Sequence, residues 1–421
     1  MKIVWPLVKL LFVFILMILM LRKNLSIGTT MMISTGMLGI IFGLNILLLI
    51  KQFGLTFIDA DTLSLIFILV LIMILESIMR HTGMLETMTN SLSHLPLNHG
   101  IQVAIIPAIV GFLPSAGGAR FTAPLVAQAT ANTLYKAEDK VFINYWFRHI
   151  WEFSLPLYPG LILASHIAGI PIGTMFLGLW PVSMLWALLG YWLVFKHNYH
   201  ERRQETVLSA KNCENHNHNT NTNSDKEIRA FLKVFINNTW PLWATVILAL
   251  FIPILWALIL VLCCLILQKR YPLLRIWQTL IEPLTIRIVL LTWGIMAFKD
   301  VLELSGAVVQ VSNSIAVLKV PVLVLLIVLP LITGMLTGMV QACAGISFPL
   351  LVSIVEPSAG YAMLAYVAGT VGVMISPIHL CLILTIDYFK ANFMRCYKSL
   401  ILPGLTPIAA ALGIYWFYRF F

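Results

Sequence analysis

The sequence predicts an all-α polytopic membrane protein with about ten transmembrane helices, arranged as two inverted five-helix repeats that each contain a re-entrant hairpin. Its composition, its long apolar runs and an internal duplication support this fold class. Apolar residues make up 60% of the chain and charged residues only 10%, whereas a soluble domain carries roughly 25% charged residues. So few charges cannot cover a water-facing surface, which excludes soluble enzymes, nucleic-acid binders and secreted disulfide scaffolds.

The apolar runs are long enough to cross a bilayer, which takes roughly 20 residues per helix. The first run is expected to remain as a span rather than be cleaved as a signal peptide, because it lacks a small-x-small cleavage site and Arg22 and Lys23 follow it. Whether residues 240–267 form one span or two is open, with Pro253 as the point of division. The predicted spans are residues 3–21, 27–50, 62–79, 143–168, 172–196, 237–252, 254–269, 285–302, 360–386 and 398–418.

A polar insert divides the chain into a first repeat (1–196), a cytoplasmic linker (197–236) and a second repeat (237–421). Residues 212–224 read NCENHNHNTNTNS, a low-complexity composition typical of disorder. The histidines of this segment and Cys213 could ligate a metal, but a solvated loop is the favoured interpretation. No cysteine spacing suggests a metal site or a disulfide framework, so we predict no metal and interpret the cysteines as packing residues.

Two apolar regions, residues 101–127 and 324–351, are interrupted by glycine, proline and small polar residues. Irregular backbone survives within a membrane only where protein or a water-filled cavity satisfies its polar groups. Both regions are therefore predicted to be re-entrant hairpins rather than simple spans.

The two halves of the chain are related by a shift of 223 residues. Residues 73–111 then align with 296–334 without a gap, and matches fall on turn-forming residues such as the glycine pair Gly83 and Gly306. Each copy would hold five spans, and because five is odd the second copy must be inverted.

With the linker in the cytoplasm, eighteen Lys and Arg residues lie inside and five outside, which follows the positive-inside rule and places both termini outside. The excess of Lys and Arg is therefore explained by membrane topology and does not indicate binding to nucleic acid.

Inverted repeats with broken elements are typical of secondary transporters, whose sites lie near the midplane between the repeats. At the first hairpin tip, glycine amides could bind an anion, and Arg120 offers a planar cation suited to carboxylate or phosphate; alternatively, Arg120 pairs with a buried acid or extends to the interface. The second tip offers neutral oxygens that suit sodium or a polar substrate, although Gly334 and Gly338 could equally serve helix packing. The predicted substrate-binding residues are Ser115, Gly117, Gly118, Arg120, Thr122, Thr333, Thr337, Gln341 and Ser347.

Ionisable residues within spans are costly and often functional. Arg148 and Glu152 stand one helical turn apart and could form a structural pair. His379 could carry protons, because imidazole titrates near neutral pH, or it could be a satisfied core residue. The predicted coupling or gating residues are Glu76, Glu152, Lys299, Asp300 and His379.

Five segments occur in order along the chain: GFLPSAGGARFTAPLV, INYWFRHIWEFSLPLYPG, FKDVLELSG, TGMLTG with GISFPLL, and SPIHLCLILTIDYFKAN. They resemble the prokaryotic membrane family called Domain of Unknown Function 401, which is grouped with the ion transporter superfamily of antiporters, arsenite pumps and di- and tricarboxylate carriers. The resemblance implies an elevator-type inverted-repeat fold in the cytoplasmic (inner) membrane, often as a homodimer, and assigns no substrate. The chain lacks the Ser-Asn-Thr hairpin signatures of the dicarboxylate carriers, which argues against a sodium-dicarboxylate assignment.

The expected function is secondary active transport, coupled to a cation, of a small anionic organic solute across the cytoplasmic membrane. The alternative is a sodium/proton antiporter, in which the carboxylates titrate and Arg120 is only a counter-ion. A non-transporting scaffold subunit is less favoured, and an enzyme is not expected, because the spans contain no H-E-x-x-H motif, no G-x-S-x-G motif and no facing aspartates. The expected partners are the solute and the lipid bilayer, with Na⁺ or H⁺ as the coupling ion and no other cofactor.

Overall fold

The computed structural model describes residues 5–23, 25–84, 87, 99–112, 118–131, 133, 135–196, 224–317, 320–356 and 358–420. Within these residues the protein is helical, without a β-strand, which confirms the all-α class. Two residues predicted at the first hairpin tip, Ser115 and Gly117, lie outside the described residues, as does nearly all of the low-complexity segment 212–224.

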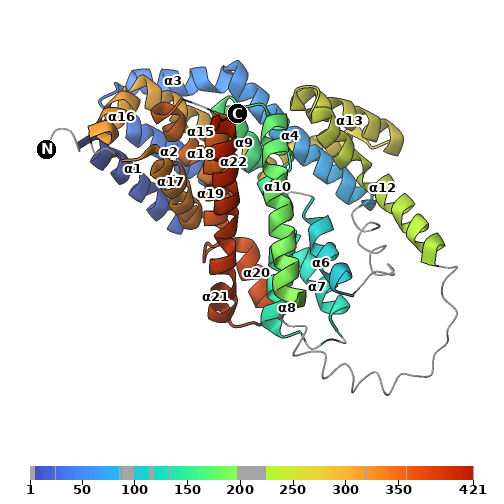
Figure 1. Ribbon diagram of the computed structural model, residues 1–421. Helices are drawn as coiled ribbons and strands as arrows, with labels where there is room; N and C mark the ends of the chain where they lie inside the picture. Colours follow the sequence, from blue (N-terminus) through green and yellow to red (C-terminus); the bar gives the residue numbers. More distant parts are fainter. Residues whose placement is uncertain are drawn as a thin grey trace.

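Helices fill both halves of the chain (Figure 1). The first half contains α1 (Trp5–Arg22), α2 (Ile27–Ile41), α3 (Ile46–Ile58), α4 (Ala60–His81), α6 (His99–Val110), α7 (Gly118–Ala129), α8 (Ala137–Arg148), the 3-10 helix η1 (Ile150–Phe153), α9 (Pro159–Ala168), α10 (Ile172–Tyr191) and the π-helical turn η2 (Trp192–Lys196). The second half contains α12 (Ser224–Ala249), α13 (Ile254–Lys269), α14 (Leu273–Ile281), α15 (Pro283–Leu304), α16 (Ala307–Val317), α17 (Val322–Thr337), α18 (Val340–Ile354), α19 (Ala359–Met374), α20 (Leu380–Phe389), α21 (Phe393–Gly404) and α22 (Thr406–Phe420).

Several of these helices are apolar, as a membrane protein requires. Three helical stretches among the described residues are also long enough to cross a bilayer alone: Ala60–His81, Ile172–Phe195 and Phe393–Arg419. The pair Leu273–Ile281 and Pro283–Leu304, bent by 57°, would add a fourth. The other apolar helices are 10–17 residues long, which is shorter than the roughly 20 residues of a simple span.

Three stretches predicted as single spans are interrupted by four or more residues between two α-helices: residues 27–50, 143–168 and 360–386. In the first, the side chain of Asn45 caps a new helix by accepting from the Leu47 amide. The other two contain prolines at the interruption, and proline can neither donate a backbone hydrogen bond nor fit a helix interior without strain.

The stretch 240–267 divides into two helices, because α12 ends at Ala249 and α13 begins after Pro253. The α12 helix begins at Ser224, within the residues that the sequence assigned to the linker. This part of the linker therefore continues the second half as a helix.

Helix contacts of the first half recur in the second. The α6 helix packs against α8 as α17 packs against α19, α4 against α13 as α15 against α2, and α7 against α20 as α18 against α9. The α4 and α15 helices differ by 223 residues at both ends, 60 to 283 and 81 to 304. Near the middle of the molecule, α10 and α22 lie side by side (Figure 1).

Two aligned glycines, Gly111 and Gly334, permit the same close helix contact in the two halves. A Cβ on Gly111 would collide with the backbone carbonyl oxygen of Arg148, and a Cβ on Gly334 with that of Gly369. Neither carbonyl can move without distorting its helix. We expect Gly334→Ala to destabilise the protein by about 1–3 kcal/mol, the usual cost of overpacking, measured as a lower midpoint of thermal unfolding in detergent.

The matched control for this substitution is Gly54→Ala. Gly54 lies in α3, and a Cβ there meets no atom within 4 Å. Alanine is favoured over glycine inside a helix by roughly 0.5–1 kcal/mol, so this variant should unfold at the same temperature as the parent protein or above it. Equal destabilisation by both substitutions would rule out the close contact at Gly334.

Candidate functional site

A cavity of about 220 Å³ lies where the α8–α9 and α19–α20 breaks meet the turn between α17 and α18. Most of its wall is apolar and comes from α4, α9 and α15 as well as from these turns. Its polar and ionisable lining consists of Glu76, Arg148, His149, Glu152, Tyr158, Gln341, His379 and Cys381.

The first break positions Arg148, His149 and Glu152. The α8 helix ends at Arg148, a short 3-10 helix carries Glu152, and α9 resumes at Pro159, a residue suited to the first turn of a helix because it has no N–H to satisfy. Tyr366 holds the turn by donating its hydroxyl to the Glu152 carbonyl at 2.7 Å. This hydrogen bond satisfies one backbone carbonyl at the break and ties the break to α19.

The second break and the α17–α18 turn position His379. Ser376 donates its hydroxyl to the Met335 carbonyl at 2.6 Å, which ties the break to α17. Gly338 ends α17 with a φ of +64°, a conformation that glycine adopts without strain. Its carbonyl then accepts a hydrogen bond from Nδ1 of His379 at 3.0 Å.

Opposite charges and ring nitrogens meet inside the cavity. The Nε2 atoms of His149 and His379 lie 3.3 Å apart, and Glu152 Oε2 lies 3.8 Å from His149 Nε2. Arg148 Nη1 lies 3.7 Å from Cys381 Sγ. The two histidines are 2% and 6% exposed and Arg148 is 4% exposed, so these groups interact with little screening by water.

Four of the residues predicted as binding or coupling groups line this cavity: Glu76, Glu152, Gln341 and His379. Arg148 and Glu152 are not one continuous helical turn apart, as the sequence suggested, because α8 ends between them.

Other predicted residues lie away from the cavity. Asp300 on α15 accepts hydrogen bonds from Thr56 and Gln52 of α3, and Lys299 precedes it on the same helix. Thr122, Thr333, Thr337 and Ser347 instead donate to backbone carbonyls close to them in sequence.

The rest of the first predicted tip is described in part. Gly118 begins α7 and Arg120 follows within the same helix, but the position of the Arg120 side chain is outside what the structure describes, together with Ser115 and Gly117.

Three residues that line the cavity are absent from the predicted site residues: Arg148, His149 and Cys381. The sequence pattern allows a structural ion pair for Arg148 and favours a packing role for Cys381. A usable signal was present, because FRHIWEFSLP and SPIHLC both place polar residues beside a proline inside an apolar stretch.

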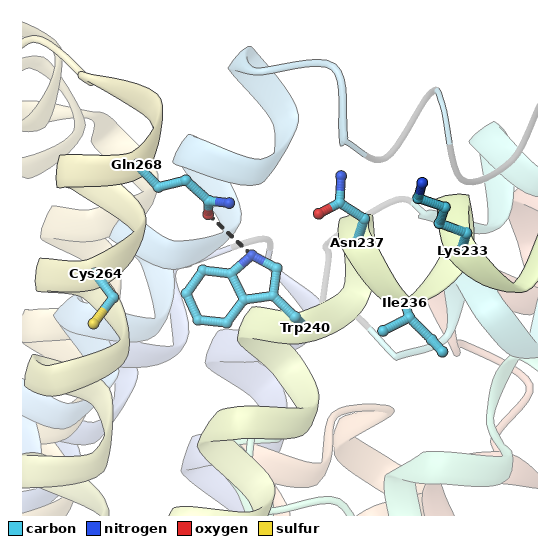
Figure 2. A pocket seen from close by; sticks show the side chains of 6 residues that line it. All are labelled: Lys233, Ile236, Asn237, Trp240, Cys264 and Gln268. Atoms are coloured by element: carbon cyan, nitrogen blue, oxygen red, sulfur yellow. Dashed lines mark hydrogen bonds between the residues drawn. The ribbon is translucent and has the colours of Figure 1, made fainter.

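A larger hollow of about 750 Å³ lies between α12 and α13 (Figure 2). There Trp240 donates its indole N–H to Gln268 Oε1 at 3.1 Å, which joins the two helices. Lys233 is exposed, and among the described residues no carboxylate or imidazole lines the hollow. It therefore lacks the opposed charges of the buried cavity.

Comparison with known protein families gives one assignment. A family model described as "Protein of unknown function (DUF401)" matches residues 6–214 and 216–417, which include every residue of the cavity lining. No curated protein matches the chain. The protein belongs to the DUF401 family.

Proposed function

We propose that the protein is a secondary active transporter, coupled to a cation, that moves a small anionic organic solute across the cytoplasmic membrane. The observation that carries this proposal is the cavity in which one guanidinium, one carboxylate and two imidazoles from the breaks of two helices meet a second carboxylate, Glu76 of α4. Ionisable groups within an apolar helical protein are costly and mark pathways for ions and solutes. Broken helices supply backbone groups to such sites in transporters.

The recurring helix contacts support two inverted repeats with the elevator-type architecture of the ion transporter superfamily. In this proposal α6–α7 and α17–α18 are the re-entrant hairpins, and α8–α9 and α19–α20 are the discontinuous spans packed against them. The Lys and Arg distribution favours about ten spans with both termini outside. Movement of these helices against the rest would expose the cavity to either side in turn.

The size of the cavity and the side chain of Arg148 favour a small anion. Its volume of about 220 Å³ is below the roughly 300–1,000 Å³ of sites for drug-sized ligands. The Arg148 guanidinium offers a planar fork of donors that matches a carboxylate, and Gln341 adds an amide to the lining of the same cavity. Glu76 and Glu152 provide the negative charges that would hold the coupling cation.

The proposal is tested with purified protein in sealed proteoliposomes under an imposed sodium or proton gradient. A panel of small radiolabelled carboxylates is offered, and an internal pH dye follows protons. We expect saturable, gradient-driven uptake of at least one acid. Proton movement driven by sodium alone would instead identify a sodium/proton antiporter. No movement under either gradient, in vesicles proved sealed, would exclude a cation-coupled carrier of these acids and favour the scaffold interpretation.

A further inference from the structure

Two buried imidazoles face each other at the cavity. His149 Nδ1 lies 2.6 Å from the Tyr145 carbonyl oxygen, and His379 Nδ1 lies 3.0 Å from that of Gly338. A carbonyl oxygen only accepts hydrogen bonds, so each Nδ1 must carry a proton. In the neutral tautomers both Nε2 atoms then present lone pairs, and these atoms are 3.3 Å apart. Two lone pairs at this separation repel unless a cation lies between them.

The spacing of the two nitrogens fits a tetrahedral metal ion. Two imidazole nitrogens, each about 2.0–2.1 Å from a tetrahedral zinc ion, lie about 3.3 Å from each other. The Nδ1–carbonyl contacts are the outer hydrogen bonds that usually orient metal-bound histidines. His149 and His379 are therefore placed and oriented as two ligands of one tetrahedral metal ion would be.

Two further ligand types stand beside the imidazoles. The Sγ atom of Cys381 lies within 4.8 Å of a ligand nitrogen of each histidine, and Glu152 Oε2 lies 3.8 Å from His149 Nε2. The guanidinium of Arg148 lies 3.7 Å from Sγ, where it would stabilise the negative charge of a metal-bound thiolate. A thiolate and a carboxylate together would balance the charge of a divalent ion.

We propose that His149, His379 and Cys381, with Glu152 as the fourth ligand, bind one transition-metal cation of the zinc class. Imidazole and thiolate ligands select zinc, cobalt or copper, whereas sodium, magnesium and calcium prefer oxygen. The sequence did not predict this site, because His149 and His379 are 230 residues apart along the chain. The inference goes beyond the proposed transport of an organic anion. It shares Glu152 with that proposal, but its test measures metal binding and does not depend on transport.

Cobalt(II) is the probe, because it occupies zinc sites and its spectrum reports both thiolate ligation and coordination geometry. Purified full-length protein is treated with a chelator, desalted and titrated with cobalt, followed by zinc. The background protein carries Cys213→Ser, His216→Asn and His218→Asn, which removes ligands in the Asn-rich insert. We expect one equivalent of cobalt to give a thiolate charge-transfer band with visible bands of tetrahedral intensity, and zinc to abolish both.

Cys381→Ser should remove the charge-transfer band and weaken binding at least about 10-fold, since even outer contacts of metal sites change affinity by 10–100-fold. The matched controls are Cys396→Ser and His166→Gln, which change a cysteine and a histidine that do not line the cavity. Both controls should keep the spectrum and affinity of the background protein. The proposal is overturned if cobalt does not bind, if the band is missing, or if it persists in Cys381→Ser.

A second measurement needs no substitution in the site. Zinc should protect Cys381 from alkylation, read by mass spectrometry, while the exposed residues Cys263 and Cys264 react equally with and without zinc. Alkylation of Cys381 at an unchanged rate would contradict the site even if the serine variant failed to fold. A single proton shared by the two imidazoles would produce this result.

Discussion

Replacing Glu152 with Gln is expected to lower gradient-driven solute uptake in proteoliposomes at least about 10-fold. Glutamine keeps the shape of the side chain and the backbone contact with Tyr366, but it removes a buried negative charge that faces His149. Contacts with a charged group contribute about 1.5–3 kcal/mol, and each 1.4 kcal/mol corresponds to a factor of ten. The measurement is the initial uptake rate at subsaturating solute, with the amount of folded protein matched by size-exclusion chromatography.

The control for this prediction is Glu303→Gln. Glu303 lies at the exposed end of α15, away from the cavity, and its loss should leave the uptake rate within about twofold, because exposed charges contribute little. If the Glu152→Gln protein folds and transports at the parental rate, Glu152 is not a coupling residue.

Replacing Arg148 with Lys is expected to raise the solute concentration needed for half-maximal uptake at least about 10-fold. Lysine keeps the positive charge but loses the planar fork that binds a carboxylate through two parallel hydrogen bonds. Since Arg148 is 4% exposed, water cannot replace the missing donors. Uptake is measured over a range of solute concentrations, so that a change in half-saturation is separated from a change in maximal rate.

Arg395→Lys is the matched control, because the Arg395 side chain is 79% exposed where it meets Glu138 at 3.9 Å. Its half-saturation should equal that of the parent protein. If Arg148→Lys also left half-saturation unchanged, the cavity would require a positive charge but not a guanidinium, and recognition of a carboxylate by two hydrogen bonds would be wrong.

The fold class could be predicted because it depends on composition and on local patterns. An apolar fraction of 60% leaves few alternatives to a helical membrane protein. The alignment at a shift of 223 residues anticipated helices α4 and α15, whose ends correspond at that shift. Glycine also indicated the α17–α18 turn, where Gly338 adopts a positive φ, whereas Pro330 and Pro349 lie inside the two helices.

The cavity could be predicted only in part, because its residues meet through tertiary packing. Glu152 and His379 were selected as ionisable groups in apolar stretches, without any indication that they face the same cavity. The partner of His379 is His149, which a sequence pattern cannot connect with it across 230 residues. Asp300 is also an acid in a predicted span, but it lies outside the cavity lining, and its carboxylate accepts hydrogen bonds from Thr56 and Gln52 of a neighbouring helix.

We infer that the cavity opens to each side of the membrane in turn, and the reactivity of Cys381 in its lining reports this directly. In a protein with the other cysteines replaced by serine, an impermeant thiol reagent is added to the inside or the outside of sealed, uniformly oriented vesicles that contain a chelator. We expect Cys381 to be labelled from both sides, at rates that shift in opposite directions when a solute gradient is imposed. Labelling from one side only, unchanged by any gradient, would contradict it.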